Sequence, residues 1–266
     1  MYAFEIVRPG SVAEAAKALS GEAKVLAGGH TLIPTLKQRL ANPGKLVDIS
    51  GIGELKGIRR EGSNLVIGAT TRHVDVANSA EVKSAIPALA HLAGHIGDPQ
   101  VRNAGTIGGS LANNDPAADY PSAALALGAT IVTNKREIAA DSYFTGLFST
   151  ALSPDEIITA IRFPVPGKAG YAKFEQPASR YALVGVFVAK TASGVGAVRV
   201  AVTGAGANGV FRSEALEKAL SISFVPAAAK GIKIGSSDLI SDIHGSADYR
   251  AALIPVMASR AVANAG

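Results

Sequence analysis

The sequence predicts an α+β protein. Helical patterns and short apolar runs alternate along most of its 266 residues, and the last hundred residues carry two longer apolar runs typical of paired strands. With 48% hydrophobic residues, the chain has ample material for a core. Its length suits one large or two to three small domains. We expect three parts, with boundaries that give the ranges 1–54, 55–168 and 169–266.

The first part reads as a small βα module. Ser11 and Glu14 have the spacing of a capping box, which predicts a helix over residues 11–20. Residues 25–27 read as a short strand that enters a glycine pair. Leucine and isoleucine at helical spacing from Leu32 onward predict a helix after this pair. Residues 46–49 read as a second strand.

The middle part again mixes predicted helices and short strands. A strand is predicted at residues 65–67, and Thr71 is expected to cap a short helix through Val76. The Ala- and Leu-rich stretch from Glu81 to His95 predicts one helix. Two further strands are expected at residues 131–132 and 157–163, the second of which ends at Pro164.

The last part changes character. Residues 183–190 and 198–202 read as paired strands. Ser213 is placed to cap a helix that ends near Leu220, and Ser246 is placed to cap a final helix. Two or three strands with helices make a small α+β domain.

Two diglycine segments about 80 residues apart are the most informative feature of the chain. They are Ala27-Gly28-Gly29-His30-Thr31 and Thr106-Ile107-Gly108-Gly109-Ser110. The second lies within residues 96–119, a long non-periodic stretch of the kind that is usually functional. Each segment can present bare backbone N–H groups to a phosphate, so the pair suggests a ligand as long as a dinucleotide. The alternative is two tight turns that need only the conformational freedom of glycine.

Three other motifs carry weaker signals. Residues 204–209 fit G-x-G-x-x-G, but no acidic residue ends a following strand, so we interpret them as a glycine-rich turn. His91 and His95 have a metal-chelating spacing, yet no third ligand is evident, and ordinary polar positions on a helix are the better interpretation. His30 could act as acid, base or anion contact, and we favour a role for its backbone N–H group.

Composition excludes several classes of protein. The chain has no cysteine, which removes disulfides, thiolate metal sites and cysteine nucleophiles and fits a cytosolic, hence cytoplasmic, protein. The net charge is +5, but the basic residues are scattered without an aromatic platform, so nucleic-acid binding is not expected. The N-terminus lacks a signal peptide, and no apolar run could span a membrane. The mean hydropathy of +0.25 fits either surface buried against partner chains or simply an Ala- and Gly-rich composition.

With their flanking residues, the two diglycine segments resemble a known family. Residues 27–34, Ala-Gly-Gly-His-Thr-Leu-Ile-Pro, are similar to one signature of the FAD-binding medium subunits of molybdenum hydroxylases. Residues 100–112, together with Asp115-Pro116-Ala117-Ala118-Asp119-Tyr120-Pro121, resemble the second signature of these subunits. This family includes the carbon monoxide dehydrogenase and xanthine dehydrogenase types. The resemblance covers essentially the whole chain.

The resemblance implies an FAD-binding fold of the vanillyl-alcohol-oxidase or p-cresol-methylhydroxylase type. In it, two α+β subdomains hold FAD, and a C-terminal α+β domain with a three-stranded antiparallel sheet and helices follows. It also implies that FAD is bound, with no metal ligands and no catalytic side chains, by these residues: Ala27, Gly28, Gly29, His30, Thr31, Leu32, Ile96, Thr106, Gly109, Ser110, Ala112, Asn113, Asp119, Ile158, Lys173 and Tyr181.

Three departures from the family pattern stand out. Thr31 replaces the usual serine and keeps the hydroxyl, and Ser110 replaces the usual asparagine with a shorter reach. Arg180 stands where the family often has aspartate, beside the position of Tyr181, which changes the expected charge near the flavin. The chain also lacks the cysteines with which one subgroup binds an extra iron–sulfur cluster.

By the same resemblance, the chain is an electron-transfer subunit of an oxidoreductase. Electrons would pass from [2Fe–2S] clusters of a small subunit through FAD to an external acceptor, while a large subunit holds the molybdenum cofactor. The implied assembly is a heterotrimer doubled to a hexamer, (αβγ)2. Two alternatives remain: a stand-alone FAD-dependent oxidoreductase that uses a nicotinamide nucleotide, and a phospholigand-binding protein without flavin. The substrate and the electron acceptor are not determined by this sequence.

Overall fold

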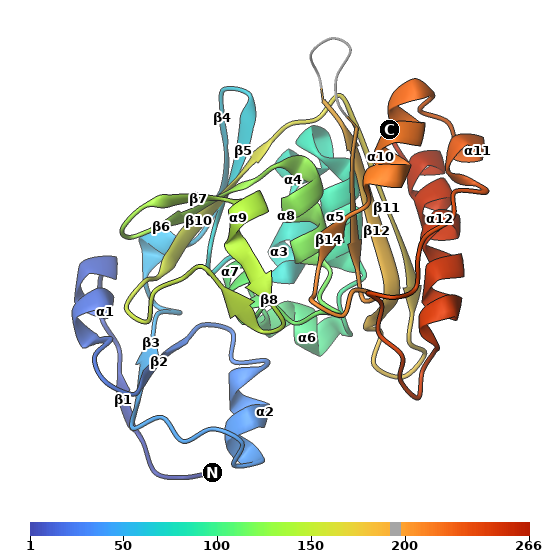
Figure 1. The fold of residues 1–266 in the computed structure, drawn as a ribbon. Helices are drawn as coiled ribbons and strands as arrows, with labels where there is room; N and C mark the ends of the chain where they lie inside the picture. Colours follow the sequence, from blue (N-terminus) through green and yellow to red (C-terminus); the bar gives the residue numbers. More distant parts are fainter. Residues whose placement is uncertain (192–197) are drawn as a thin grey trace.

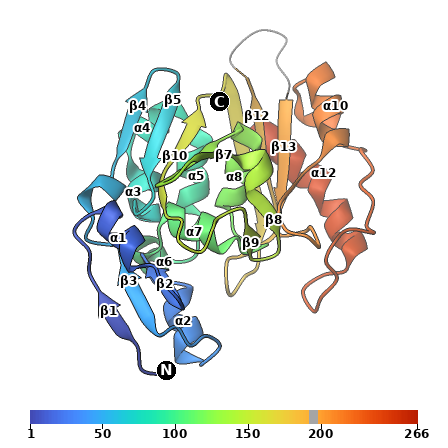
Figure 2. The ribbon, with the colours of Figure 1, turned by 60° about the vertical axis from the view of Figure 1, so that its left-hand side comes forward.

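Three main sheets follow one another along the chain, as Figure 1 shows. The structure is a computed structural model that describes residues 1–191 and 198–266. The N-terminal sheet lies at one end of the molecule, the central sheet and its helices lie in the middle, and the C-terminal sheet lies at the other end. Figure 2 gives the same arrangement from the side. The predicted α+β class is confirmed.

The N-terminal part is a three-stranded parallel sheet in the order β1 (Glu5–Val7), β3 (Lys45–Asp48), β2 (Ala23–Leu26). Helix α1 (Val12–Ala18) follows β1, and helix α2 (Leu32–Lys37) follows β2. The Ser11 hydroxyl accepts from the Glu14 N–H at 3.2 Å, so the predicted helix start is confirmed.

The central sheet has five antiparallel strands in the order β4, β5, β10, β6, β7. Ile161 of β10 pairs with Ile67 of β5 on one side and with Ile131 of β6 on the other, and all three are buried. The strand bounds are β4 Ile58–Glu61, β5 Asn64–Gly68, β6 Thr130–Thr133, β7 Glu137–Ala139 and β10 Ile158–Pro164.

A set of short helices and one small hairpin complete the central part. The 3-10 helix η1 (Gly53–Leu55) precedes β4, and the hairpin of β8 (Phe144–Gly146) and β9 (Ser149–Thr150) follows α9. The helix bounds are α3 His73–Asn78, α4 Ala80–Ala85, α5 Pro87–Gly94, α6 Pro99–Ala104, α7 Ile107–Asn113, α8 Tyr120–Leu127 and α9 Ala140–Tyr143.

Three predictions for this part were wrong. The single helix expected over residues 81–95 is two helices, because Pro87 starts a new helix at α5 and Ile86 before it, with φ −143° and ψ 75°, is not helical. Thr71 does not cap α3, since its hydroxyl donates to the Gly57 carbonyl and Arg72 precedes the helix. The stretch 96–119 is not irregular, because it contains α6 and α7.

The C-terminal part is a four-stranded antiparallel sheet in the order β11 (Lys168–Glu175), β12 (Ala182–Lys190), β13 (Val198–Thr203), β14 (Phe211–Arg212). The expected three-stranded sheet therefore has a fourth, two-residue strand, which is too short to give a sequence pattern.

Helices cover both faces of this C-terminal sheet. Helix α12 (Ala247–Ala263) contacts β11 and β12, and the central helices α5 and α8 contact strands of the same sheet. This double covering explains why β12 is an almost continuous apolar run with eight buried residues. Helices α10 (Glu214–Ile222) and α11 (Pro226–Ala229) lie beside α12 (Figure 1).

Helix α12 approaches the sheet so closely that β11 needs a glycine there. A Cβ atom added to Gly170 would lie 1.9 Å from the Ala261 carbonyl oxygen of α12. We predict that Gly170→Ala lowers the free energy of unfolding by about 3 kcal/mol, because helix and strand must separate. Chemical denaturation measures this loss. Gly235→Ala is the control, since an added Cβ there meets nothing within 4 Å. Equal stability of the two variants would contradict the prediction.

One histidine is buried in the central part without full hydrogen bonding. His73 is 5% exposed, and its Nδ1 atom has no hydrogen-bond partner among the described residues. Its ring packs at 5.3 Å against the ring of the buried Tyr120. Burial, with smaller contributions from His30 and Arg102, lowers the pKa of His73 from 6.5 to about 4.

The low pKa of His73 predicts that the folded state loses stability in acid. Because the folded state holds the neutral ring, the stability that His73 contributes is complete above pH 6.5 and is lost as the pH falls toward 4. At pH 5 the loss amounts to about 2 kcal/mol. Between pH 7 and pH 5, the free energy of unfolding should therefore fall by about that much more in the wild type than in His73→Gln. Denaturant titrations at both pH values measure it, with exposed His244→Gln as the control. An equal fall in the free energy of unfolding for wild type and His73→Gln would refute this prediction.

Candidate functional site

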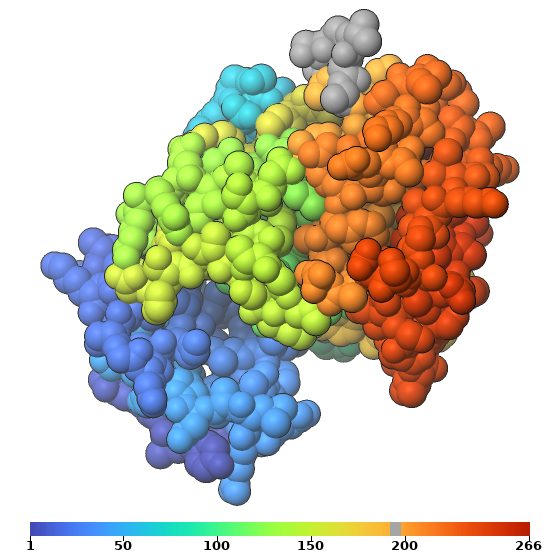
Figure 3. Space-filling model, viewed as in Figure 1, coloured from blue at the N-terminus to red at the C-terminus, as the bar shows by residue number. Residues whose placement is uncertain are grey.

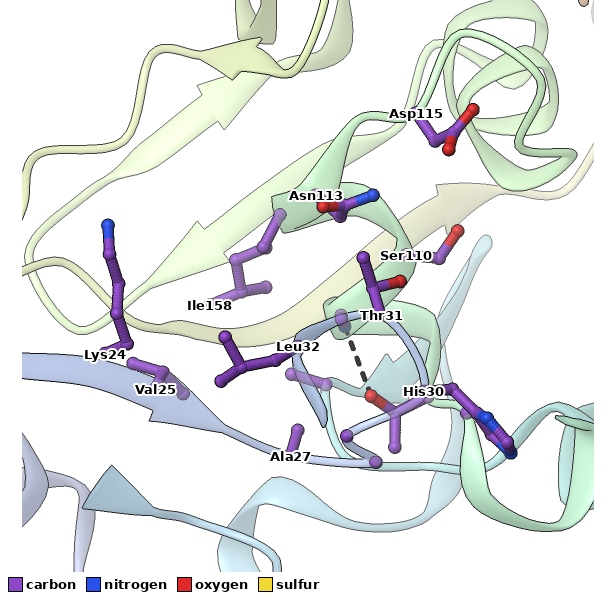
Figure 4. A pocket seen from close by; sticks show the side chains of 18 of the residues that line it. Lys24, Val25, Ala27, His30, Thr31, Leu32, Ser110, Asn113, Asp115 and Ile158 are labelled. Carbon is purple, nitrogen blue, oxygen red and sulfur yellow. Dashed lines mark hydrogen bonds between the residues drawn. The ribbon is translucent and has the colours of Figure 1, made fainter. Parts of the chain in front are cut away.

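A cleft of about 710 Å³ lies between the N-terminal and central parts, within the usual size range of ligand pockets. Figure 3 shows a hollow between the blue N-terminal residues and the green and yellow residues beside them. Four segments contribute to its lining: the turn from β2 to α2, the region from α6 to α7, the start of β10, and the end of the loop from β11 to β12. Figure 4 shows labelled side chains from the first three of these segments gathered at the cleft.

The first diglycine segment presents a row of free backbone N–H groups. Among the described residues, the N–H groups of Gly28, Gly29, His30 and Thr31 have no hydrogen-bond acceptor. Gly29 has φ +70°, a left-handed conformation that favours glycine. A turn of this kind, with consecutive N–H groups at the wall of a cleft, is suited to bind a phosphate.

The two diglycine regions touch each other directly. A Cβ atom added to Gly28 would lie 2.0 Å from the Ala104 carbonyl oxygen and 2.9 Å from the Gly105 Cα atom. Gly28 therefore allows the N-terminal turn to lie against the chain just before the second diglycine segment. Residues about 80 positions apart in the sequence form one continuous wall of the cleft.

Contrary to our prediction, the second diglycine segment does not present a row of bare N–H groups: among the described residues, only its Thr106 N–H group lacks an acceptor. The Ile107 and Gly108 N–H groups donate to the carbonyls of Thr71 and Ala69, and those of Gly109 and Ser110 both donate to Thr106. Thr106 is the N-cap of α7, and its hydroxyl accepts from Gly109 at 3.2 Å. These glycines serve close packing, because a Cβ on Gly108 would lie 2.6 Å from the Ala69 side chain.

The second segment can form hydrogen bonds with a ligand through its side chains. Within the part of the chain that the structure describes, the Ser110 hydroxyl and the Asn113 amide have no hydrogen-bond partner, and both residues line the cleft. The Thr31 hydroxyl of the first segment is likewise without a protein partner there. Figure 4 shows these three side chains at the cleft.

The structure brings together all but one of the sixteen predicted site residues. Lys173 does not line the cleft. The others do: Ala27, Gly28, Gly29, His30, Thr31, Leu32, Ile96, Thr106, Gly109, Ser110, Ala112, Asn113, Asp119, Ile158 and Tyr181. The ring of His30 contacts the Gln100 carbonyl at 3.1 Å through Nε2, which leaves its backbone N–H group facing no protein acceptor among the described residues.

Lys173 lies behind the cleft, paired with Asp119. Their side chains are 4% and 5% exposed, and Lys173 Nζ is 3.0 Å from Asp119 Oδ1. The Tyr171 hydroxyl also donates to this carboxylate, at 2.5 Å. Burial raises the pKa of Asp119, while the Lys173 ammonium and the Tyr171 hydroxyl oppose this rise. Asp119 thus connects the cleft to a buried polar network.

The loop from β11 to β12 brings Ser179, Arg180 and Tyr181 to the cleft. Tyr181 is 48% exposed, which is high for an aromatic side chain at a pocket wall. Burial of its hydroxyl, with Asp115 and Asp119 nearby, raises the pKa of Tyr181. Arg180 has φ +60°, an uncommon conformation for a residue with a side chain.

Several lining residues were not assigned to the site from the sequence. Asp115 is part of the second family signature but was not assigned to the site, and burial raises its pKa. Lys24 and Val25 lie on β2, where only the strand pattern was visible. Glu156 is buried beside Arg136, whose hydrogen bonds lower the pKa of Glu156 to about 2. Lys24, Val25 and Glu156 reach the cleft through folding, and no local motif marks them.

The weaker motifs keep their simpler interpretations. The described residues contain no group of three or more His, Cys, Asp or Glu side chains that could hold a metal ion, and the His95 ring contacts the His91 carbonyl at 2.8 Å. Residues 204–209 form a turn between β13 and β14, where a Cβ on Gly204 would meet the Ala182 carbonyl oxygen at 2.4 Å. In the described parts of the chain, no helix has both the length and the apolar character required to cross a membrane.

Comparisons with known proteins agree with this geometry. Residues 2–166 match the family described as the FAD binding domain in molybdopterin dehydrogenase. The chain is 38% identical to the carbon monoxide dehydrogenase medium chain of Hydrogenophaga pseudoflava, over 97% of this chain and 96% of that protein. It is 34% identical to the nicotine 6-hydroxylase medium subunit of Paenarthrobacter nicotinovorans, over 99% and 98%.

Solved structures give the same result. A chain of carbon monoxide dehydrogenase from Hydrogenophaga pseudoflava superposes with a TM-score of 0.88 at 38% identity, covering 98% of this chain and 96% of that one. A chain of quinoline 2-oxidoreductase from Pseudomonas putida 86 superposes with a TM-score of 0.87 at 28% identity, with coverage of 98% and 96%. The chain therefore belongs to the family of FAD-binding domains of molybdopterin dehydrogenases, and it is an FAD-containing medium subunit.

Proposed function

We propose that this subunit transfers electrons from the [2Fe–2S] clusters of a small partner subunit, through FAD held in the cleft, to an external acceptor. A large partner subunit would hold the molybdenum cofactor and bind the substrate. The observation that carries the proposal is the row of N–H groups at residues 28–31, which have no acceptor among the described residues and line a cleft of about 710 Å³. The full-length similarity to medium subunits supports it.

The residues of the cleft fit FAD. Backbone N–H groups at residues 28–31 would bind the pyrophosphate, because no described residue accepts from them and glycine at 28 and 29 has no side chain to block them. Ser110 and Asn113 would supply hydrogen bonds from the opposite segment. Buried Ile158 offers an apolar contact for a ring. We propose that the fifteen predicted residues lining the cleft bind FAD directly.

The protein's own part in the reaction is positioning and exclusion of water. When bound, FAD supplies the redox chemistry, since a flavin can hold one or two electrons. His73 stays neutral near pH 7 because of its burial, so it adds no charge beneath the cleft. Tyr181 has an exposed ring that can cover a planar ligand, and the Arg180 side chain places positive charge at the same edge, where many relatives are expected to have aspartate.

The finer features of the assembly are also proposals. We propose an (αβγ)2 complex in the cytoplasm, which the lack of cysteine and the apolar composition support. We also propose functional parts at residues 1–54, 55–168 and 169–266. The substrate is not assigned, because the relatives named above act on chemically different compounds.

We predict that Gly29→Val abolishes FAD retention. Valine is strained at φ +70°, and its Cβ atom would lie 2.9 Å from the Ile33 side chain. The turn would therefore shift and displace the row of N–H groups. FAD bound per chain after gel filtration should fall at least tenfold. Gly62→Val is the matched control, because Gly62 has φ +57° but lies in the turn from β4 to β5 with open space around it. Full FAD occupancy in Gly29→Val would refute the pyrophosphate site.

The electron-transfer role can be tested with the FAD-loaded chain and its small subunit. Anaerobic addition of chemically reduced [2Fe–2S] subunit should bleach the visible absorbance of the flavin within the mixing time. The same addition to the chain without FAD should leave the clusters reduced. Complete turnover of a nicotinamide nucleotide by the chain with FAD alone would instead favour a stand-alone oxidoreductase. A folded chain that takes up no FAD would favour a phospholigand-binding protein.

A further inference from the structure

The loop from β11 to β12 is held in an energetically costly shape. Arg180 has φ +60°, although left-handed backbone costs a residue with a side chain about 1 kcal/mol or more. Within the loop, the Arg180 N–H group donates to the Gln176 carbonyl at 2.8 Å, and the Gln176 N–H group donates to the Tyr181 carbonyl at 2.8 Å. A conformation like this persists only where other contacts determine it.

The Lys173 ammonium supplies the contacts that hold this shape. It has three N–H donors, and three acceptors lie within reach. These are Asp119 Oδ1 at 3.0 Å, the His95 carbonyl at 2.7 Å and the Arg180 carbonyl at 2.9 Å. The side chain is 4% exposed, so water contributes little to its solvation. All three donors are therefore satisfied by the protein.

The three acceptors belong to three different segments. Asp119 precedes α8, His95 follows α5, and Arg180 lies in the hairpin loop. Lys173 itself lies on β11. One buried ammonium thus fixes the hairpin loop to two segments of the central part. A second, longer contact runs from the Arg180 guanidinium to the Gly97 carbonyl at 3.4 Å.

We propose that Lys173 is a positioning residue that fixes the Arg180–Tyr181 peptide, and with it the Tyr181 ring, at the edge of the cleft. We expected Lys173 to contact the cofactor, but it does not line the cleft, and its donors are all used by protein acceptors. Its effect on a bound ligand passes through the loop. The link between this loop and FAD rests on the proposed function, whereas the restraint on the loop does not.

A simpler role for Lys173 is to neutralise Asp119. Removing only the lysine would leave a buried carboxylate without its cation, which is strongly destabilising in itself. A substitution of Lys173 alone cannot distinguish this role from loop positioning. The double variant Lys173→Met with Asp119→Asn does so, because it removes both charges and leaves Tyr171 with an amide acceptor. The Arg180 carbonyl still loses its donor in the double variant.

Trypsin gives a direct readout, since it cleaves after Arg180. The full-length chain would be digested briefly under native conditions, and fragments that end at Arg180 would be quantified by mass spectrometry. Cleavage after exposed Lys230 in the same sample normalises for trypsin activity, and cleavage after buried Arg250 reports general unfolding. We expect the cleavage rate at Arg180, relative to Lys230, to rise at least tenfold in Lys173→Met. We expect the cleavage rate at Arg180 to remain raised in the double variant. The melting temperature of the double variant should nevertheless lie closer to that of the wild type.

Two outcomes would overturn the proposal. One is wild-type protection of Arg180 in Lys173→Met. The other is protection restored in the double variant, which would leave Lys173 only its role as the partner charge of Asp119. The digestion is run on the chain with and without FAD. If the chain takes up no FAD, the proposed function fails, yet the comparison of variants without FAD still decides whether Lys173 restrains the loop.

Discussion

The close contact between Gly28 and the Ala104 carbonyl is the constraint on which the site depends. It joins the turn after β2 to the chain that leads into α7, and it leaves no space for a Cβ atom. Because of this contact, the free N–H groups of the first segment and the free side chains of the second face one cleft. Neither segment is long enough to bind both ends of a dinucleotide, and their contact makes them one surface.

The two diglycine segments have similar sequences and different physical roles. In the first, glycine permits a left-handed turn whose N–H groups remain available to a ligand. In the second, glycine permits close packing of α7 against Ala69, and the N–H groups are used by the protein itself. A bound ligand would therefore meet backbone on one side of the cleft and hydroxyl and amide side chains on the other.

The sequence predicted the parts of the fold that have local causes. The helix capped by Ser11 and three strands of the central sheet, β5, β6 and β10, follow from caps and apolar runs, and their ends were predicted to within two residues. Strands β4 and β7, of four and three residues, were not predicted. The break at Pro87 and the helix α6 were missed, because helices of six to eight residues give too few turns for a clear period. The site residues, and the place of Arg180 beside Tyr181, were predicted by family resemblance, whereas Lys24 and Glu156 reach the cleft only through tertiary packing.

The cleft is lined chiefly by residues within 19–35, 96–119, 150–158 and 179–181, which belong to all three parts of the chain. A ligand that binds there can do so only when these parts have packed together, so its binding energy adds to the stability of the whole native state. By mass action, a free ligand at one hundred times its dissociation constant contributes about 2.7 kcal/mol. Cofactor loading is therefore expected to stabilise the whole folded chain, whereas an empty chain remains more open to unfolding and proteolysis.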